Sequence, residues 1–142
     1  MSKIYCASSW RNESQPGVVE ALRKEAHEVY DFRHPAKGND GFSWRDVDPA
    51  WEMWSPKQFR AGLEHPVARR GYLVDMAALT WCDTCVLILP CGRSGHLEAG
   101  WAKGKGKGVV AYVPKSMEPE LMYSMFDDIV TTMSELLRAV GS

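Results

Sequence analysis

Glu98 is the residue of this sequence with the best setting for nucleophilic chemistry. It lies in the stretch 91–102, Cys-Gly-Arg-Ser-Gly-His-Leu-Glu-Ala-Gly-Trp-Ala, which reads as a glycine loop followed by a helix. With Ser94 as the N-cap, Glu98 projects near the positive end of that helix. Gly92 and Gly95 let the backbone approach a ligand closely, and exposed N–H groups together with the Ser94 hydroxyl would form a cradle for an anion. A carboxylate beside such a cradle is suited to catalysis.

A simpler role for Glu98 is also open. An acid in the first turn of a helix complements the helix dipole and contributes about 0.3–1 kcal/mol. Its place in the chain favours catalysis, because the loop 91–96 follows the apolar run 86–89, which reads as a strand buried on both faces. A second such run, 109–113, follows the helix, so the stretch predicts a parallel βαβ unit. Ligands of open parallel sheets bind at the carboxyl ends of the strands, where this loop lies.

The rest of the chain continues the alternation of strands and helices. The expected strands are 4–7, 29–32 and an edge strand at 128–131, and the expected helices are 16–27, 55–64, 66–81 and 134–140. The pattern predicts an α/β fold with a flavodoxin- or Rossmann-like three-layer architecture. We expect a four- or five-stranded parallel sheet with strand order 2-1-3-4-5, in a single domain over residues 1–142.

Asp75 is the second candidate for chemistry. Its neighbours at helical spacing form an apolar stripe, namely Gly71, Tyr72, Ala78 and Leu79. A carboxylate in such surroundings must be paired or must face a cavity, because burial of an unpaired charge is costly. A salt bridge to Arg69 or Arg70 is the alternative, but residues so close in sequence point elsewhere on the helix. We therefore expect a functional role.

Polar residues follow two of the expected strands at the same edge of the sheet. Ser8, Ser9 and Arg11 follow the first strand, and Arg33 follows the second. Hydroxyl and guanidinium groups at this edge could hold a phosphate or a sugar hydroxyl. We therefore count them as candidate substrate-binding residues.

The stretch 33–56 breaks the alternation and predicts a long functional loop or lid. Its aromatic side chains are Phe42, Trp44, Trp51 and Trp54. Trp44 and its neighbours could offer flat faces on which a nucleobase stacks. They could equally pin the loop to the protein core, and the sequence leaves both interpretations open.

Three further features are interpreted as structural. Asp83 caps the turn that leads out of the helix before it. The Lys-Gly run 103–108 is typical of a helix C-terminus, where glycine caps the helix and lysine complements the dipole. Cys82 and Cys85 have the spacing of half a zinc site, but no second pair follows, so we expect buried thiols. We expect no metal and no cofactor.

Composition limits the classes of partner. The chain has 142 residues, 45% hydrophobic and 25% charged, with a net charge of −1. A net charge this close to zero gives no sign of the positive surface that binds a nucleic acid polymer or an acidic membrane. The first residues, 1–7, run straight into an expected strand, so we expect no signal peptide, and no apolar run approaches the roughly 20 residues of a membrane span. We expect a cytoplasmic protein with a small-molecule ligand.

Short motifs in order along nearly the whole chain resemble the nucleoside 2-deoxyribosyltransferase superfamily, which includes the 2′-deoxynucleoside 5′-monophosphate N-hydrolases. They are Ile-Tyr-Cys-Ala-Ser-Ser at 4–9, Val-Tyr-Asp-Phe-Arg at 29–33, Asp75 ahead of Trp-Cys-Asp at 81–83, and Gly-Arg-Ser-Gly-His-Leu-Glu-Ala-Gly-Trp-Ala at 92–102. The segment around Glu98 is the most specific of them.

The resemblance implies that Glu98 attacks the anomeric carbon of a nucleoside, expels the base and forms a glycosyl-enzyme intermediate. Asp75 would hold the substrate or assist the leaving base. By the same resemblance Ser94 and Gly95 look like contacts to a 5′-phosphate, supported by Ser9 and Arg11, whereas the tryptophan-rich loop matches neither branch of the superfamily well. Together with the residues singled out above, the candidate substrate-binding residues are Tyr5, Ser8, Ser9, Arg11, Arg33, Trp44, Gly92, Ser94 and Gly95. A nucleoside or nucleotide ligand and a homo-oligomer are further implications, with the apolar surface of 73–81 available for assembly.

Two departures from the transferase pattern favour hydrolysis over base exchange. Gly92 and Ser94 occupy the region where transferases carry an Asp-x-Gly turn, and the end 139–142 lacks their aromatic and asparagine-containing tail. A non-catalytic nucleotide-binding or sensing module on the same fold is the alternative function. A carboxylate of Glu98 lying open on the surface beside Lys105 would favour that alternative.

Overall fold

The computed structural model describes residues 1–141, so Ser142, at the end of the tail compared above, lies outside it. The chain forms two compact units. The first comprises Met1–Asp31 and the chain from Leu79 onward, and the second comprises Phe32–Ala78. The single domain expected over residues 1–142 stays a prediction.

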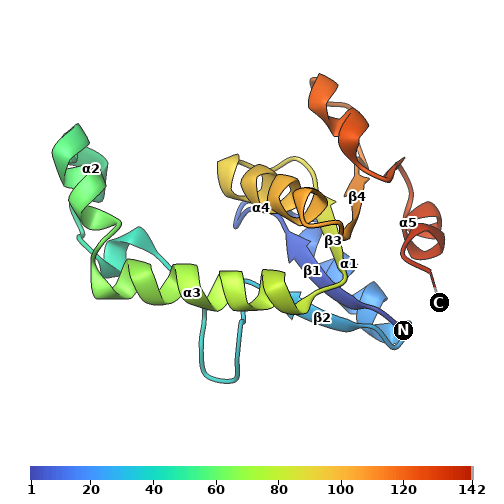
Figure 1. Ribbon diagram of the computed structural model, residues 1–142, viewed down its shortest axis with the longest axis horizontal. Coiled ribbons are helices and arrows are strands. Elements are labelled where there is room, and N and C mark those ends of the chain that lie inside the picture. Colours follow the sequence, from blue (N-terminus) through green and yellow to red (C-terminus); the bar gives the residue numbers. More distant parts are fainter. Residues whose placement is uncertain (142) are drawn as a thin grey trace. The chain divides into compact units, whose positions relative to one another are not determined.

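A five-stranded sheet organises the first unit (Figure 1). Its strands are β1 (Lys3–Ala7), β2 (Glu28–Asp31), β3 (Thr84–Ile88), β4 (Gly108–Tyr112) and β5 (Asp128–Val130). All neighbouring pairs are parallel and the order is β2-β1-β3-β4-β5. The predicted α/β class and the strand order are confirmed, and β5 is the expected edge strand. The βαβ unit expected around Glu98 is β3, α4 and β4.

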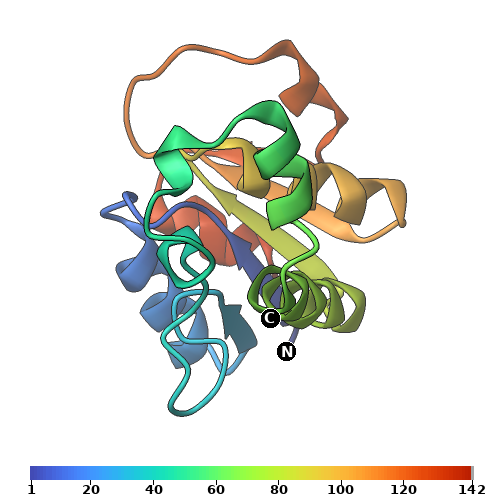
Figure 2. The same cartoon turned by 90° about the vertical axis from the view of Figure 1, so that its left-hand side faces the viewer.

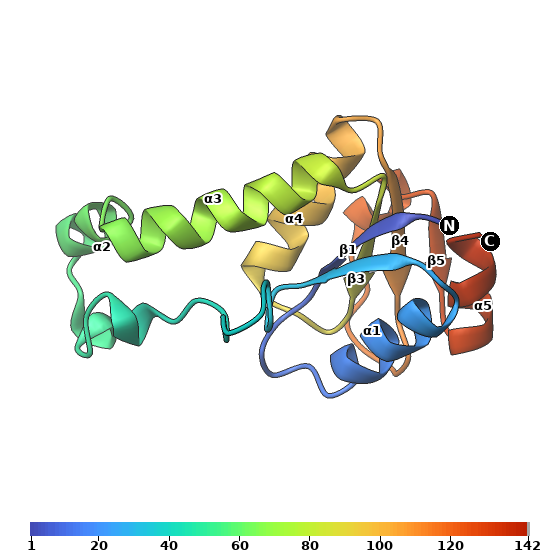
Figure 3. The ribbon, with the colours of Figure 1, turned by 90° about the horizontal axis from the view of Figure 1, so that it is seen from below.

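Helices cover both faces of this sheet (Figure 3). On one face, α1 (Gln15–Lys24) and α5 (Met133–Ala139) close the main hydrophobic core. Ile4, Val86 and Leu136 are fully buried members of that core. The other face carries α4 (Arg93–Gly104), which packs on β1, β3 and β4. Side chains alternate along a strand, so Tyr5 and Leu87 point to the α4 face.

Helix α4 begins earlier than the sequence predicts. Ser94 was expected as the N-cap, but the N-cap is Gly92, whose backbone is extended with φ −87° and ψ −155°. Ser94 is therefore the second helical residue, with an exposed side chain. The prediction was wrong because serine is the better capping residue in isolation, whereas the turn after Pro90 reaches helical geometry already at Arg93.

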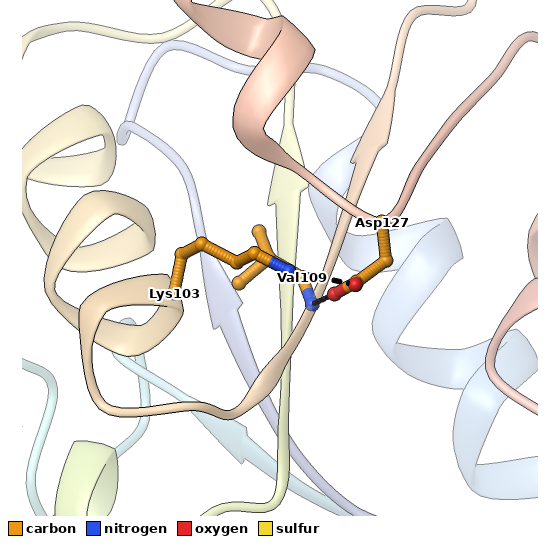
Figure 4. Close-up of polar contacts among 3 residues, drawn as sticks. All are labelled: Lys103, Val109 and Asp127. Atoms are coloured by element: carbon orange, nitrogen blue, oxygen red, sulfur yellow. Dashed lines mark hydrogen bonds and ion pairs between the residues drawn. The ribbon is translucent and has the colours of Figure 1, made fainter.

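The end of α4 agrees with the sequence. The Lys-Gly run terminates the helix at Gly104, and Gly106 has a φ of +79°, a conformation that glycine adopts without strain. The Nζ of Lys103 lies 2.7 Å from Oδ1 of Asp127, while Oδ2 of Asp127 accepts a hydrogen bond of 2.8 Å from the N–H of Val109 (Figure 4). Asp127 thus connects α4 with the start of β4.

The side chain of Asp83 binds the start of β1 and the first residue of β3, whereas the sequence predicts a cap for the turn out of the preceding helix. Its Oδ2 accepts a hydrogen bond of 3.0 Å from the N–H of Lys3, and its Oδ1 accepts one of 2.8 Å from the hydroxyl of Thr84. Cys82 and Cys85 are buried thiols, as expected.

The connection between β4 and β5 contains the short helix η3 (Leu121–Met125) and is the wide orange loop of Figure 2. It follows the carboxyl end of β4, so it belongs to the edge of the sheet where ligands of parallel sheets bind.

The second unit holds the stretch predicted as a long loop. It contains the short helices η1 (Trp44–Asp46) and η2 (Trp51–Met53), then α2 (Pro56–Gly62) and most of α3 (Pro66–Trp81). The helices expected at 55–64 and 66–81 are confirmed. None of the helices within residues 1–141 combines the length and apolar character of a transmembrane span.

Candidate functional site

The central contact of the candidate site joins β1 to α4. The hydroxyl of Tyr5 donates a short hydrogen bond to Oε2 of Glu98, a residue 93 positions later in the chain. Tyr5 is fully buried and its ring stacks on Tyr30 with 5.0 Å between centroids, whereas Glu98 is half-buried. The phenol is the donor because a carboxylate only accepts. A rigid donor beneath a partly exposed carboxylate fixes the orientation of that carboxylate.

Gly95 brings the first turn of α4 close to β3 and to the end of β1. A Cβ built at this position would lie 2.8 Å from Sγ of Cys91, 3.2 Å from Cδ1 of Leu87 and 3.5 Å from the backbone N of Ser8. Any side chain would push against atoms with little room to move. The absence of a side chain at Gly95 therefore sets how closely α4 approaches the sheet.

Two buried polar side chains join the segment after β1 to the turn after β3. The hydroxyl of Ser8 donates a hydrogen bond of 2.8 Å to the carbonyl oxygen of Ile88. The Nδ2 of Asn12 donates to the carbonyl oxygens of Ile88, at 3.3 Å, and of Pro90, at 3.0 Å. These two segments lie at the carboxyl edge of the sheet and are held to each other by side-chain amide and hydroxyl groups.

His96 connects α4 to the β4–β5 connection. Its Nδ1 lies 2.7 Å from the carbonyl oxygen of Gly92, which only accepts, so Nδ1 carries the proton in the neutral ring. Its Nε2 then accepts a hydrogen bond of 2.8 Å from the hydroxyl of Tyr123. The rings of Tyr123 and Phe126 stack with 5.9 Å between centroids. The segment that contains η3 is thereby attached to the helix that carries Glu98.

Cys91 is a second candidate nucleophile, in the turn that leads into α4. Burial, and then the negative charge of Glu98, raise the pKa of its thiol to about 11. The thiolate is the reactive form, so at neutral pH this side chain is a poor nucleophile. Glu98 is the stronger candidate for a covalent step.

The other candidates of the first unit occupy the edge that the sequence predicted. Ser9 and Arg11 follow β1, with Arg11 exposed, and Gly92 and Ser94 are exposed at the start of α4. Ser8 is buried, and its hydroxyl bonds to protein rather than facing solvent. The structure thus brings Tyr5, Glu98, Gly95 and Ser8 together. Their roles toward a ligand stay predictions.

Asp75, Arg33 and Trp44 belong to the second unit. Within it, Trp44 packs edge to face on Phe42, with centroids 4.7 Å apart, and on Trp54, with centroids 5.7 Å apart. The Nε1 of Trp54 donates a hydrogen bond of 2.8 Å to Oδ2 of Asp48. These contacts bind Trp44 and Trp54 to residues of the same unit. The two predicted roles, attachment of the loop to the protein core and stacking on a base, both stay predictions.

Sequence reasoning did not single out Asn12, His96 or Tyr123. A usable signal existed for Asn12, because an asparagine a few residues before a proline at a helix start often accepts hydrogen bonds from the following N–H groups. Its partners at Ile88 and Pro90 lie 76 and 78 residues away and leave no local pattern. The same holds for the pairing of His96 with Tyr123.

Metal binding has no support in the described part of the chain. Residues 1–141 contain no group of three or more histidine, cysteine, aspartate or glutamate side chains arranged to hold an ion.

No family model and no curated protein matches the sequence, whereas solved structures do. The 2-deoxyribosyltransferase from the psychrotolerant bacterium Bacillus psychrosaccharolyticus is similar with a TM-score of 0.59 and 20% identity, over 94% of this chain and 88% of that chain. A conserved protein from Enterococcus faecalis V583 gives a TM-score of 0.61 at 18% identity, over 99% and 97%.

The CMP N-glycosidase BcmB of Clostridium botulinum gives a TM-score of 0.50 at 18% identity, over 96% of this chain and 95% of that chain. Identities this low show a shared fold. The resemblance found in the sequence is confirmed at that level, since a deoxyribosyltransferase and an N-glycosidase have the same fold over nearly the whole chain.

Proposed function

We propose that this protein cleaves the N-glycosidic bond of a nucleoside or deoxynucleoside, or of its 5′-monophosphate, with Glu98 as the nucleophile. The observation that carries the proposal is the hydrogen bond from the buried Tyr5 hydroxyl to Oε2 of the half-buried Glu98. A nucleophilic carboxylate needs a fixed orientation toward the carbon that it attacks. Tyr5 supplies that fixation from a strand in the interior of the sheet.

The reaction proceeds in two steps. Oε1 of Glu98 attacks the anomeric carbon, the C1′–N bond breaks, and its electron pair leaves with the base, which takes up a proton. The sugar is then bound to Glu98 as an ester. Water attacks the same carbon, releases the free sugar or sugar phosphate and restores the carboxylate. Two displacements at one carbon retain its configuration.

Several features favour an enzyme over a binding module. Glu98 is bonded to Tyr5 rather than lying open beside Lys105, whose Nζ lies over the ring of Trp101 at 5.6 Å from its centroid. Cys91, with a pKa of about 11, does not compete as nucleophile at neutral pH. The shared fold with a deoxyribosyltransferase and a CMP N-glycosidase supports the same reaction class.

The remaining candidates receive roles within this proposal. Ser94 and the N–H of Gly95, with Ser9 and Arg11, would contact a 5′-phosphate. Asp75 would hold the substrate or assist the leaving base, Arg33 would orient the ligand, and Trp44 would stack on the base. Water is the proposed acceptor, because Gly92 and Ser94 at the start of α4 depart from the transferase pattern. Assembly into a homo-oligomer is part of the proposal and is not needed for the chemistry.

The test is release of free base from a panel of 2′-deoxynucleosides, ribonucleosides and their 5′-monophosphates, each with and without a second base. Wild type is compared with Glu98→Gln, which keeps the size of the side chain and replaces the nucleophilic carboxylate with a neutral amide. We expect base release by wild type and loss of release by on the order of a thousandfold or more in Glu98→Gln, with an unchanged melting temperature.

Each outcome has a distinct meaning. Release that depends on Glu98 and is unaffected by a second base indicates a hydrolase, whereas formation of a new nucleoside indicates a transferase. A preference for monophosphates that Ser94→Ala weakens supports the phosphate contact. Wild-type rates in a folded Glu98→Gln protein contradict the proposed mechanism, and no release from any member favours a nucleotide-binding module.

A further inference from the structure

We propose that Asn12 is a positioning residue for the reaction of Glu98, because its side-chain amide holds the turn that leads into α4. This inference rests on the proposed function. Asn12 itself lies between β1 and α1, is 5% exposed and is assigned no contact with substrate. It acts through the backbone that it holds.

The amide of Asn12 uses both of its ends. Its Nδ2 donates to the carbonyl oxygens of Ile88 and Pro90, at 3.3 Å and 3.0 Å. Its Oδ1 accepts from the N–H groups of Ser14 and Gln15, at 2.8 Å and 2.9 Å. Carbonyl oxygens only accept and backbone N–H groups only donate, so these four partners fix which end of the amide is which.

Asparagine is the side chain that meets this requirement. An aspartate at the same place keeps the acceptor for the N–H groups of Ser14 and Gln15 but turns an oxygen toward the two carbonyl oxygens. An alanine leaves all four partners without the bonds from Asn12, which is most costly for the two buried ones, the carbonyl of Ile88 and the N–H of Gln15. The two functions of the amide, as a cap for the start of α1 and as a clamp on the turn after β3, can therefore be separated by substitution.

The clamped turn determines where α4 starts. Ile88 is the last residue of β3, Pro90 follows two residues later, and α4 begins at Arg93 after Gly92, a residue without a side chain to cap the helix. The start of α4 is therefore fixed by its neighbours. The clamp of Asn12 and the hydroxyl of Ser8 hold the turn, and Glu98 lies in the second turn of the same helix.

A small shift of this turn would move the carboxylate of Glu98. Helix α4 is a stiff element, so a displacement at its first residue moves Glu98 relative to Tyr5 on β1. Misplacement of a reacting group by about 1 Å can reduce a rate by about a hundredfold. Tyr5 fixes the carboxylate from the strand, and Asn12 fixes the helix that carries it.

The test compares Asn12→Asp, Asn12→Ala and wild type in the full chain. The matched control is Asn39→Asp, the same amide-to-acid change in the second unit, where Oδ1 of Asn39 accepts a hydrogen bond of 2.9 Å from the N–H of Gly41. Three quantities are measured: kcat and KM for base release from the nucleoside and nucleotide panel, amide hydrogen exchange over residues 88–98, and the melting temperature.

We expect Asn12→Asp to lower kcat by about tenfold to a hundredfold and to change KM by less than about threefold. Exchange over residues 91–95 should become faster, while exchange at the start of α1 stays at the wild-type rate because the cap is retained. Asn12→Ala should speed exchange in both segments and melt at a lower temperature than Asn12→Asp. Asn39→Asp should match wild type in all three measurements.

Two results would contradict the proposed positioning role of Asn12. Wild-type kcat and wild-type exchange over residues 91–95 in Asn12→Asp show that the bonds to Ile88 and Pro90 position nothing. Equal acceleration of exchange in α1 and in residues 91–95 shows a general structural role. If wild type itself releases no base, the proposed function fails, and the exchange comparison still decides whether Asn12 holds the turn.

Discussion

The hydroxyl of Tyr5 forms a hydrogen bond with Oε2 of Glu98. This bond joins a buried residue of β1 to the side of α4 that faces the sheet. The bond sets a donor from the rigid sheet against the proposed nucleophile. Its removal should affect chemistry more than folding.

Tyr5→Phe removes this donor and keeps the aromatic ring that stacks on Tyr30. We expect kcat for base release to fall by about tenfold or more, since loss of an oriented hydrogen bond in an active site costs about 2 kcal/mol or more. Tyr112→Phe deletes a hydroxyl from a buried tyrosine on the opposite face of the sheet and serves as the control. Equal kcat values for the two variants would contradict the role given to Tyr5.

Gly95→Ala and Gly100→Ala place the same methyl group at two positions of α4. At Gly95 it meets Cys91 and Leu87, so we expect the free energy of unfolding to fall by about 1–3 kcal/mol. No atom of residues 1–141 outside the helix backbone and the adjoining residues lies within 4 Å of a Cβ at Gly100, and alanine there should stabilise the helix by about 0.5–1 kcal/mol. Urea unfolding measures both free energies, and a Gly95→Ala protein at least as stable as wild type would contradict the close packing described for Gly95.

The thiol of Cys91 reports on the charge of Glu98 without any substrate. Its pKa of about 11 predicts alkylation by iodoacetamide at about pH 8 that is on the order of a hundredfold slower than that of a free cysteine. Glu98→Gln removes the negative charge, so the pKa of Cys91 should fall and alkylation at fixed pH should become faster. Peptide mass spectrometry assigns the modification to Cys91.

Glu28→Gln is the control for this experiment, because it removes a carboxylate at the amino end of β2. It should leave alkylation of Cys91 unchanged. A Glu98→Gln protein that reacts no faster than the control would contradict the effect of the Glu98 charge on the pKa of Cys91.

The contribution of Asp127 to the stability of the protein should depend on pH and be lost at low pH. The hydrogen bond from Lys103, and then that from the N–H of Val109, lower the pKa of its carboxyl below the ordinary value of 3.8. A carboxyl with a lowered folded-state pKa stabilises the protein above its unfolded pKa, and the contribution disappears as the pH falls through the folded pKa. Because the pair is partly exposed, the contribution at neutral pH is below about 1 kcal/mol.

Asp127→Asn should therefore melt slightly below wild type at about pH 7, and the difference should vanish at about pH 2–3. Added salt should reduce the difference, because screening weakens an exposed pair. Asp128→Asn, an adjacent exposed carboxyl whose Oδ1 accepts from the N–H of Ile129, is the control. A difference from wild type that persists at low pH would assign the effect to the side-chain shape rather than to the charge.

The elements of the fold were predictable where local pattern determines them. The runs 86–89 and 109–113 are apolar and continuous, as central parallel strands require, and they correspond to β3 and β4 within about two residues. Pro56 and Pro66 marked the starts of α2 and α3 because proline is favoured in the first turn of a helix. The strand order came from recognising this alternation as the flavodoxin-like kind.

The candidate site was predictable only in part. Glu98 could be singled out because the glycine loop before it has a recognisable composition. The contacts of Asn12 with Ile88 and Pro90, and of His96 with Tyr123, join residues distant in sequence, so the local sequence does not reveal them. Ser94 was misplaced as the N-cap because intrinsic capping preference was overridden by the geometry of the turn after Pro90.

The aromatic side chains of the second unit pack against glycines of the same unit. Trp54 packs against Gly62 so tightly that a Cβ there would lie 2.3 Å from Cη2 of the indole, and Phe42 packs in the same way against Gly71, at 3.0 Å from Cδ1. The segment 32–78 thus has close packing contacts of its own. A sequence change that enlarges Gly62 or Gly71 must therefore be matched by a smaller or shifted aromatic side chain within the same segment.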